Sequence, residues 1–301
     1  MILFVDTNPI LERRLIGDSF PKGGTGRASS SETIAAGYGA DMAILANNMN
    51  EESRLLTFLG GLAGERYERI LRQSGNVVEV QRLKDETQER FVMEEKYKTS
   101  RIYTEEPRLT REDILDFYER FVIETASSDA VVLAKGTRSD NPEEMKLPMV
   151  RYARKKSKPV MMFSDENDAV DAVREAKPFG IIIDRDALGR IAGKKLQFLS
   201  DVTSALKALY GGDIPLILVT GGVKGSILYF RGECYYAKND EESDSFNPHF
   251  AGVAMAAGIV RNYDAPMLLK LAAAAAQSER DADFAKIKSD MNRIHVQKME
   301  V

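Results

Sequence analysis

Short apolar runs alternate with amphipathic helical patterns along almost the whole chain. The runs predict buried strands at Ile2–Val5, Leu55–Leu59, Ala130–Leu133, Pro159–Phe163, Phe179–Ile183 and Ile214–Thr220. The amphipathic patterns predict helices at Gly64–Gln73, Thr110–Thr125, Glu143–Lys155, Asp168–Ala176 and Asp201–Leu209. This alternation indicates an α/β fold, a doubly wound and mostly parallel sheet with helices on both faces. Right-handed crossovers would then place a ligand crevice at the carboxyl ends of the strands.

Two regions interrupt this alternation. Residues Leu11–Ser31 are polar and rich in glycine, and Gln88–Tyr103 alternates between apolar and polar positions. The second region predicts a pair of strands with one apolar face, which includes Phe91 and Met93. Because such a face is exposed unless something covers it, we expect a small separate sheet with a partner.

After Thr220 the pattern predicts a hairpin and then three helices. The hairpin strands are Ser226–Phe230 and Glu233–Ala237. The alanine run Ala272–Ala276 is flanked by leucines, which favours a tightly packed buried helix over a low-complexity segment. No internal repeat and no linker is visible, so residues 1–301 are expected to form a single domain with insertions at about 11–31 and 88–103.

Composition excludes several classes of function. The net charge of −4 gives no electrostatic footprint for nucleic acid. The first residues lack a basic signal-peptide start, and no run approaches about 18 apolar residues, so a cytoplasmic protein without a membrane span is expected. The single cysteine, Cys234, excludes an internal disulfide and is expected to be a packed thiol. With only His249 and His295 present, histidine triads and histidine-rich metal sites are improbable, and we expect His249 to be packed rather than catalytic.

The segment Glu242–Gly258 is a turn that leads into a helix of small residues. Asn247 is suited to the N-cap and Pro248 to the first helical position, where its missing N–H costs nothing. The start of such a helix presents free backbone N–H groups and a positive dipole end. It is therefore a natural site for a phosphate or another anion.

Seven segments carry a resemblance to a known family. In chain order they are Asn8-Pro9-Ile10-Leu11-Glu12-Arg13, Gly23-Gly24-Thr25-Gly26-Arg27-Ala28, Ala36-Gly37-Tyr38-Gly39-Ala40-Asp41-Met42-Ala43, Phe58-Leu59-Gly60-Gly61 followed by Gly64, Ala176-Lys177-Pro178-Phe179, Thr220-Gly221-Gly222-Val223-Lys224-Gly225 and Phe250-Ala251-Gly252. Together they resemble the PfkB (ribokinase-like) carbohydrate kinases, in the branch of fructose-1-phosphate and tagatose-6-phosphate kinases. Each motif is weak alone, but their common order covers essentially the whole chain.

The resemblance implies a ribokinase-like fold with a small β-sheet lid that covers the sugar and pairs two subunits into a homodimer. It implies a phosphotransferase with an alcohol acceptor, which uses ATP and Mg²⁺ to phosphorylate a small sugar phosphate. By position, the implied substrate-binding residues are Glu12, Arg27, Gly37, Gly39, Asp41 and Arg90. The implied nucleotide-binding residues are Asp184, Thr220, Gly222 and Gly225, and no metal ligands are assigned.

The position of the catalytic base stays open between two residues. In the family, the Asp of Gly-Ala-Gly-Asp is the base and the preceding backbone holds the phosphate. An alignment without a gap from Ala251-Gly252 puts Asn247 at the base position, whereas three extra residues put Asp244 there. Asparagine cannot accept the proton as a carboxylate would, so the two alignments predict different chemistry.

Two functions are therefore carried forward. The first is an ATP-dependent kinase acting on a phosphorylated ketohexose or a similar small molecule. The second is a catalytically inactive protein of the same fold that binds a ligand or a protein partner in the inherited crevice. Departures from the family pattern favour the second: Tyr38 replaces the sugar-binding lysine, and Glu241-Glu242-Ser243 replaces glycines. The high frequency of enzymes among proteins of this fold favours the first.

Overall fold

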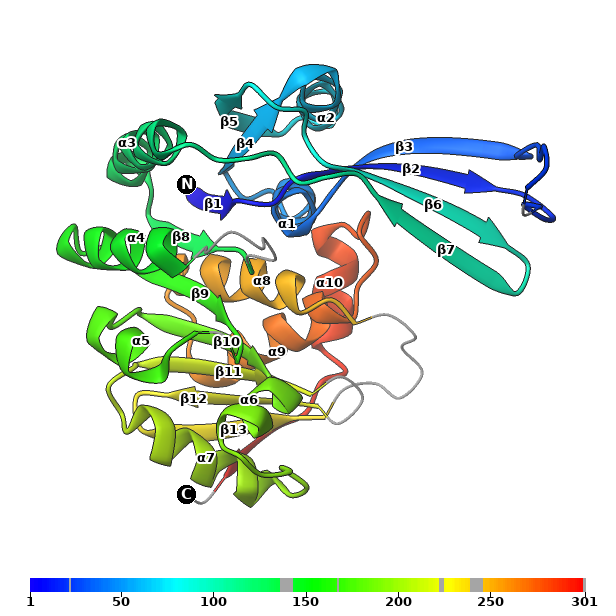
Figure 1. Cartoon of the computed structure of the whole chain (residues 1–301). Coiled ribbons are helices and arrows are strands. Elements are labelled where there is room, and N and C mark those ends of the chain that lie inside the picture. The colour runs from blue at the N-terminus through cyan, green and yellow to red at the C-terminus, as the bar shows by residue number, and fades with distance from the viewer. Residues whose placement is uncertain (22, 136–142, 167, 222–224, 239–245, 300–301) are drawn as a thin grey trace.

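The computed structural model describes residues 1–21, 23–135, 143–166, 168–221, 225–238 and 246–299. Within these ranges the chain forms a body of one large sheet between two layers of helices, and a smaller sheet that extends from the body as an arm (Figure 1). The expected α/β fold with a lid-like second sheet is confirmed.

The large sheet has ten strands, and from β5 to β11 all neighbouring strands are parallel. The strands β12 to β14 add an antiparallel edge. The spatial order is β14 (Val296–Met299), β13 (Glu233–Ala237), β12 (Ser226–Phe230), β11 (Leu216–Thr220), β10 (Gly180–Asp184), β9 (Val160–Ser164), β8 (Ala130–Leu133), β1 (Ile2–Asp6), β4 (Ser53–Gly60) and β5 (Val77–Leu83).

Helices cover both faces of this sheet because the central strands are apolar on both sides. Along β1, Ile2 and Phe4 join one buried cluster, whereas Leu3 and Val5 join the other. The first cluster contains side chains of α1 (Tyr38–Asn48), α2 (Gly61–Gln73), α8 (Pro248–Val260), α9 (Ala265–Ala276) and α10 (Phe284–Met291). The second contains side chains of α3 (Arg111–Ser127), α4 (Glu143–Lys155), α5 (Val170–Ala176), α6 (Arg185–Ile191) and α7 (Leu199–Tyr210).

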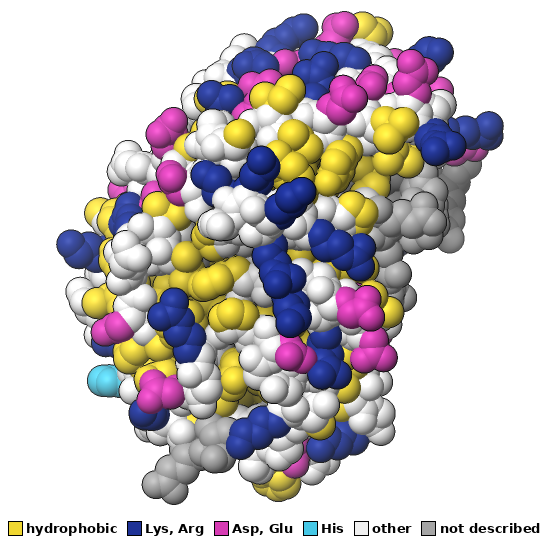
Figure 2. All heavy atoms as spheres, turned by 90° about the vertical axis from the view of Figure 1, so that its left-hand side faces the viewer, with side chains coloured by type: hydrophobic (Ala, Val, Ile, Leu, Met, Phe, Trp, Pro, Cys, Tyr) yellow, Lys and Arg dark blue, Asp and Glu magenta, His cyan; other side chains and the backbone are white. Residues whose placement is uncertain are grey.

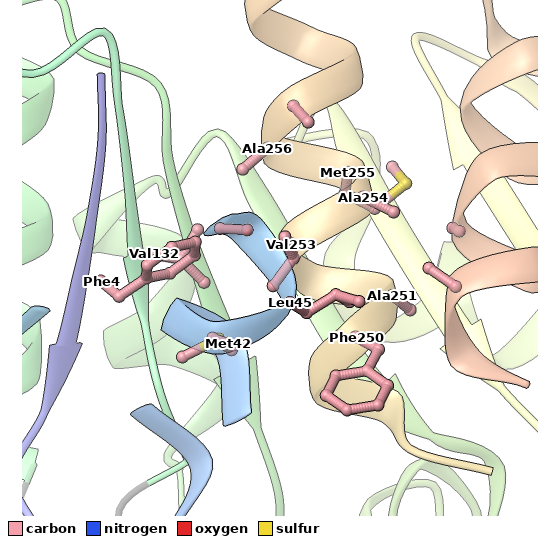
Figure 3. Packing of buried hydrophobic residues seen from close by; sticks show 14 of the residues in the cluster. Phe4, Met42, Leu45, Val132, Phe250, Ala251, Val253, Ala254, Met255 and Ala256 are labelled. Carbon is pink, nitrogen blue, oxygen red and sulfur yellow. The ribbon is translucent and has the colours of Figure 1, made fainter. Parts of the chain in front are cut away.

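The helix α8 lies at the centre of the first cluster, and its small residues let neighbouring elements approach closely. Figure 3 shows Val253 of α8 near Leu45 of α1, with Phe4 and Val132 of the sheet to their left. A Cβ atom on Gly252 would lie 2.6 Å from the ring of Phe163, so only glycine fits there. The alanine run of α9 is buried, as its leucine-flanked pattern predicted.

The small sheet contains β3 (Ser30–Ala36), β2 (Ile10–Ile16), β6 (Glu89–Glu95) and β7 (Lys98–Tyr103), in that order. The expected hairpin in Gln88–Tyr103 is present as β6 and β7. Register places Leu15 opposite Met93 and Phe91 opposite Ile102, so these side chains share one face. Glu12 lies opposite Arg90 on the other face.

Two strands of the large sheet are absent from the sequence prediction. Both β5 and β14 are edge strands with polar residues among their apolar ones, and therefore lack a continuous apolar run. Cys234 is buried within β13, as expected. In the described part of the chain, no helix combines the length and the apolar content that a bilayer crossing requires.

Candidate functional site

The N-termini of α1 and α8 meet at the carboxyl ends of the central strands. The helix α1 begins after Gly37, whose φ of 102° lies in the left-handed region that favours glycine. The helix α8 begins with Pro248 and is capped by Asn247, whose Oδ1 accepts a hydrogen bond from the His249 N–H at 3.0 Å. The predicted cap and the predicted N1 proline are confirmed. Two positive helix ends therefore converge on one crevice.

Gly39 is required by its contact with Asp6, which ends β1. The Gly39 N–H donates to Asp6 Oδ2 at 2.7 Å, and a Cβ atom on Gly39 would lie 2.4 Å from the Asp6 Cβ. Burial raises the pKa of the Asp6 carboxyl, while the N–H groups of Asn8 and Gly39 lower it. Asp6 thus holds the turn before α1 and is too deeply buried to reach a ligand directly.

Charged side chains from the arm and from α1 line the crevice and form three ion pairs. Glu12 on β2 is almost fully buried, and its carboxylate lies 2.5 Å from Arg90 on β6 and 2.9 Å from Arg14. Asp41 on α1 lies 2.9 Å from Nε of Arg280, which follows α9. The carboxylates in this part of the crevice are therefore balanced by arginines.

Asp41 is the carboxylate that faces the start of α8. Burial raises its pKa, and Arg280, Arg90 and the amide of Asn247 all act to lower it. Arg280 also donates a hydrogen bond to the carbonyl oxygen of Ala35 in β3. Arg280 therefore ties α1 to the base of the arm, beside the capping residue of α8.

A second part of the crevice is a cavity of about 350 Å³ beside the start of α8. Asp184 and Thr220 line it from the carboxyl ends of β10 and β11, where they are paired in register. Asp184 caps α6, because its Oδ1 accepts a hydrogen bond from the Ala187 N–H at 2.7 Å. Lys135, after β8, also lines the cavity and lies 3.4 Å from the Asp165 carboxylate.

His249 lines the cavity beside the start of α8. Its ring stacks on Tyr38 at 3.7 Å between centroids and lies 4.2 Å from the ring of Phe163. Burial lowers its pKa to about 3, so the ring is neutral at pH 7. Its Nδ1 is buried and has no hydrogen-bond partner among the described residues. The expectation that His249 is a packed residue is confirmed.

The structure brings most residues of the predicted site together in two groups. Glu12, Gly37, Gly39, Asp41 and Arg90 lie around the start of α1, with Asn247 opposite them. Asp184 and Thr220 line the neighbouring cavity, and Gly225 follows at the turn before β12 with a φ of 83°. Asp244 and Gly222 lie outside the described residues.

Arg27 lies apart from both groups. It is exposed in the loop between β2 and β3, at the end of the arm that is distant from the body (Figure 1). From Ile10 to Ile16 the arm extends about 20 Å, at roughly 3.3 Å for each residue. Arg27 therefore does not reach the crevice of its own chain.

Sequence reasoning assigned no role to Asp6, Lys135 or Arg280. Asp6 directly follows the predicted strand Ile2–Val5. A carboxylate at the carboxyl end of a strand could have indicated that Asp6 belongs to the site. The sequence around Arg280 gives no such indication, because only the tertiary fold brings Arg280 to Asp41. No group of three or more acidic, histidine or cysteine side chains that could hold a metal ion occurs among the residues described.

A family model described as pfkB family carbohydrate kinase matches residues 9–278. No curated protein matches the chain.

Solved structures with a similar fold include several sugar-phosphate kinases. A putative phosphofructokinase from Staphylococcus aureus has a TM-score of 0.85 at 18% identity, with 100% of this chain and 99% of that one covered. A possible 1-phosphofructokinase from Thermotoga maritima has a TM-score of 0.82 at 21% identity, with 99% of each chain covered. Phosphofructokinase-2 from Escherichia coli, in complex with fructose-6-phosphate, has a TM-score of 0.84 at 16% identity, with 97% of this chain and 98% of that one covered.

Proposed function

This chain belongs to the pfkB family of carbohydrate kinases, and we propose that it transfers the γ-phosphoryl group of ATP to a hydroxyl of a phosphorylated ketohexose. The observation that carries the proposal is the meeting of two helix N-termini, at Gly37 and Asn247, beside the carboxylates and arginines of the arm and α1. Such a site can hold phosphate groups and hydroxyl groups next to each other. Release of ADP that depends on a sugar phosphate is the direct test.

The substrate would lie between the arm and the start of α1. Carboxylate oxygens of Asp41 can accept hydrogen bonds from sugar hydroxyls, and the guanidinium of Arg90, which the buried Glu12 holds in place, can bind the phosphate already on the sugar. Gly37 and Gly39 leave the backbone of the turn open to close approach. Arg27 could add a second cation near the substrate phosphate only if it came from another subunit.

The nucleotide would occupy the cavity lined by Asp184 and Thr220, and Gly222 and Gly225 are the other proposed nucleotide-binding residues. The described residues suit a Mg²⁺ ion that arrives with ATP better than a resident ion, because Asp184 is the carboxylate at this cavity and also caps α6. Bound to the nucleotide, Mg²⁺ would neutralise charge on the phosphates. The N–H groups at the start of α8 would face the transferred phosphoryl group.

We assign the base to Asp244. Its carboxylate would take the proton of the acceptor hydroxyl as that oxygen bonds to the γ-phosphorus and the bond to ADP breaks. Asn247, the alternative at this position, serves as the cap of α8, and its amide interacts with Asp41.

One observation favours the catalytically inactive alternative. Without a carboxylate at Asn247, the described start of α8 carries no base, and His249 is neutral and packed between aromatic rings. If Asn247 occupies the base position, the crevice would bind a ligand or partner without turning it over.

Nucleotide binding is expected to be weak, with a dissociation constant for Mg-ATP above about 1 μM. The acidic residues Glu242 and Asp244 precede α8 in sequence and would repel phosphate groups nearby, which Mg²⁺ offsets only in part. Thr220→Val should weaken binding a further fivefold or so, the usual value of one hydrogen bond. Calorimetry measures the dissociation constants for Mg-ATP of the wild type and of Thr220→Val, with Thr203→Val in α7 as the matched control. Sub-micromolar affinity, or equal affinity in both variants, would contradict the assignment.

The arm is expected to join two copies of the chain into a homodimer. Leu15, Phe91, Met93 and Ile102 form a shared face on the arm, and Ile102 is 54% exposed in the single chain. We expect sedimentation at micromolar concentration to give a dimer, and Phe91→Glu to give a monomer.

The matched control for this variant is Ile123→Glu, which places the same charge on an exposed apolar position of α3. It should leave the dimer intact. A wild-type monomer at micromolar concentration, or a dimer unaffected by Phe91→Glu, would exclude the arm as the interface.

A further inference from the structure

A larger cavity lies on the side of the large sheet opposite the crevice, at the amino ends of β9, β10 and β11. Its volume is about 840 Å³, within the range of small-molecule sites. The floor is apolar and includes Pro159, Pro178, Pro215, Phe179 and Phe230. Figure 2 shows this side of the molecule, with apolar side chains in a hollow and Lys and Arg side chains around it.

The lining of this cavity is positively charged. Arg154, Lys177 and Arg231 line it, and none of them forms an ion pair with a carboxylate among the described residues. The two acidic residues of the lining already have partners. Asp213 lies 2.9 Å from Arg174, and Asp264 accepts a hydrogen bond from the Met267 N–H at 2.9 Å. The lining therefore carries an excess of positive charge, and among its described residues Asp264 is the one carboxylate without an ion pair.

Helix dipoles explain part of this charge but not all of it. Arg154 lies in the last turn of α4 and Lys177 at the end of α5, where cations favour the negative helix end. Arg231 lies in the hairpin turn between β12 and β13 and belongs to no helix. Its φ of 50° is left-handed, a conformation that Gly or Asn adopts more readily. Its guanidinium lies 5.0 Å from the Phe230 ring, at the wall of the cavity.

We propose that this cavity is a second binding site, for an organic anion that carries a planar apolar ring. Lys177 and Arg231 would hold the anionic group, and the ring would lie against Phe179 and Phe230. The site is separate from the proposed kinase crevice. The helix α8 begins at that crevice with its Asn247 cap and ends at this cavity, which Ile259 lines.

The probe for this site is 1-anilinonaphthalene-8-sulfonate, an aromatic anion whose fluorescence rises on binding. Fluorescence titration of the native protein should show saturable binding with one site for each chain. Lys177→Ala/Arg231→Ala should raise the dissociation constant about tenfold or more, as expected for the loss of two ion pairs. Lys84→Ala/Lys195→Ala removes the same charge from exposed positions elsewhere and should change it less than twofold. Non-saturable binding, or equal affinity in the two double variants, would overturn the proposal.

Displacement of the probe at constant ionic strength then identifies the anionic group. Phenyl phosphate or benzoate should displace it, and the more effective of the two shows whether the site prefers a phosphate or a carboxylate. Inorganic phosphate should be at least tenfold less effective, because it lacks the ring. Equal displacement by inorganic phosphate and phenyl phosphate would show that charge alone binds here and would refute the role of the apolar floor.

Discussion

Replacement of Asp244 by asparagine is expected to lower kcat for sugar-phosphate phosphorylation by about 10²–10⁴-fold, the usual contribution of a general base. The reason is that an amide cannot take the proton of the acceptor hydroxyl during phosphoryl transfer. The free energy of unfolding should change little, since the segment before α8 is rich in polar residues. A coupled assay of ADP release gives kcat, and Glu241→Gln in the same segment is the matched control.

The companion variant is Asn247→Asp, which separates the two alignments. If Asp244 is the base, Asn247→Asp should not raise activity, because Asp41 lies beside position 247 and a second carboxylate there adds repulsion. Full wild-type activity in Asp244→Asn would contradict the assignment of the base. Activity gained by Asn247→Asp from an inactive wild type would place the base position at Asn247.

Acidification is expected to destabilise the fold through His249. The pKa of His249 is about 3 in the folded chain, whereas a histidine in the unfolded chain has its ordinary pKa of 6.5. The unfolded chain therefore binds the proton more readily. The contribution of a neutral His249 to the free energy of unfolding is fully present above about pH 6.5. It is lost as the pH falls toward the pKa of the folded chain. The loss through this residue is about 1.4 kcal/mol for each pH unit below pH 6.

The variant His249→Phe keeps an aromatic ring between Tyr38 and Phe163 and removes the titration. The free energy of unfolding, from denaturant titrations between pH 7.5 and 4.5, should therefore fall less steeply in His249→Phe than in the wild type. Because the buried Asp6 and Asp41 titrate in both proteins, only the difference between the two curves reports on His249. His295→Gln at the exposed second histidine should follow the wild type. Parallel curves for wild type and His249→Phe would show that the His249 ring is not held in a buried, neutral form.

The central strands and the capping of α8 were predictable because local rules govern them. Continuous apolar runs such as Phe179–Ile183 are buried on both faces, and Asn247-Pro248 is a self-contained helix start. The edge strand β5 has no such run, because Glu79 and Arg82 interrupt its apolar residues. Its pairing with β4 is decided by the tertiary fold rather than by its own pattern.

The crevice was predictable where glycines mark it and not where distant side chains complete it. Gly37 and Gly39 stood in a turn whose backbone needs them, and the structure gives the reason in the contact with Asp6. The partner of Asp41 is Arg280, which is distant in sequence and belongs to no recognised motif. Arg27 is distant from the crevice because the arm is long. A comparison of motifs does not predict the length of the arm.

The most direct test of the proposed function is the rate of ADP release by the wild-type protein with Mg-ATP and a panel of sugar phosphates. The panel would contain fructose 1-phosphate, fructose 6-phosphate and tagatose 6-phosphate. We predict that at least one of them raises ADP release well above the rate without sugar, and that Asp244→Asn abolishes this increase. No sugar-dependent release across the panel, from a folded protein, would contradict the kinase proposal and favour a catalytically inactive binding protein.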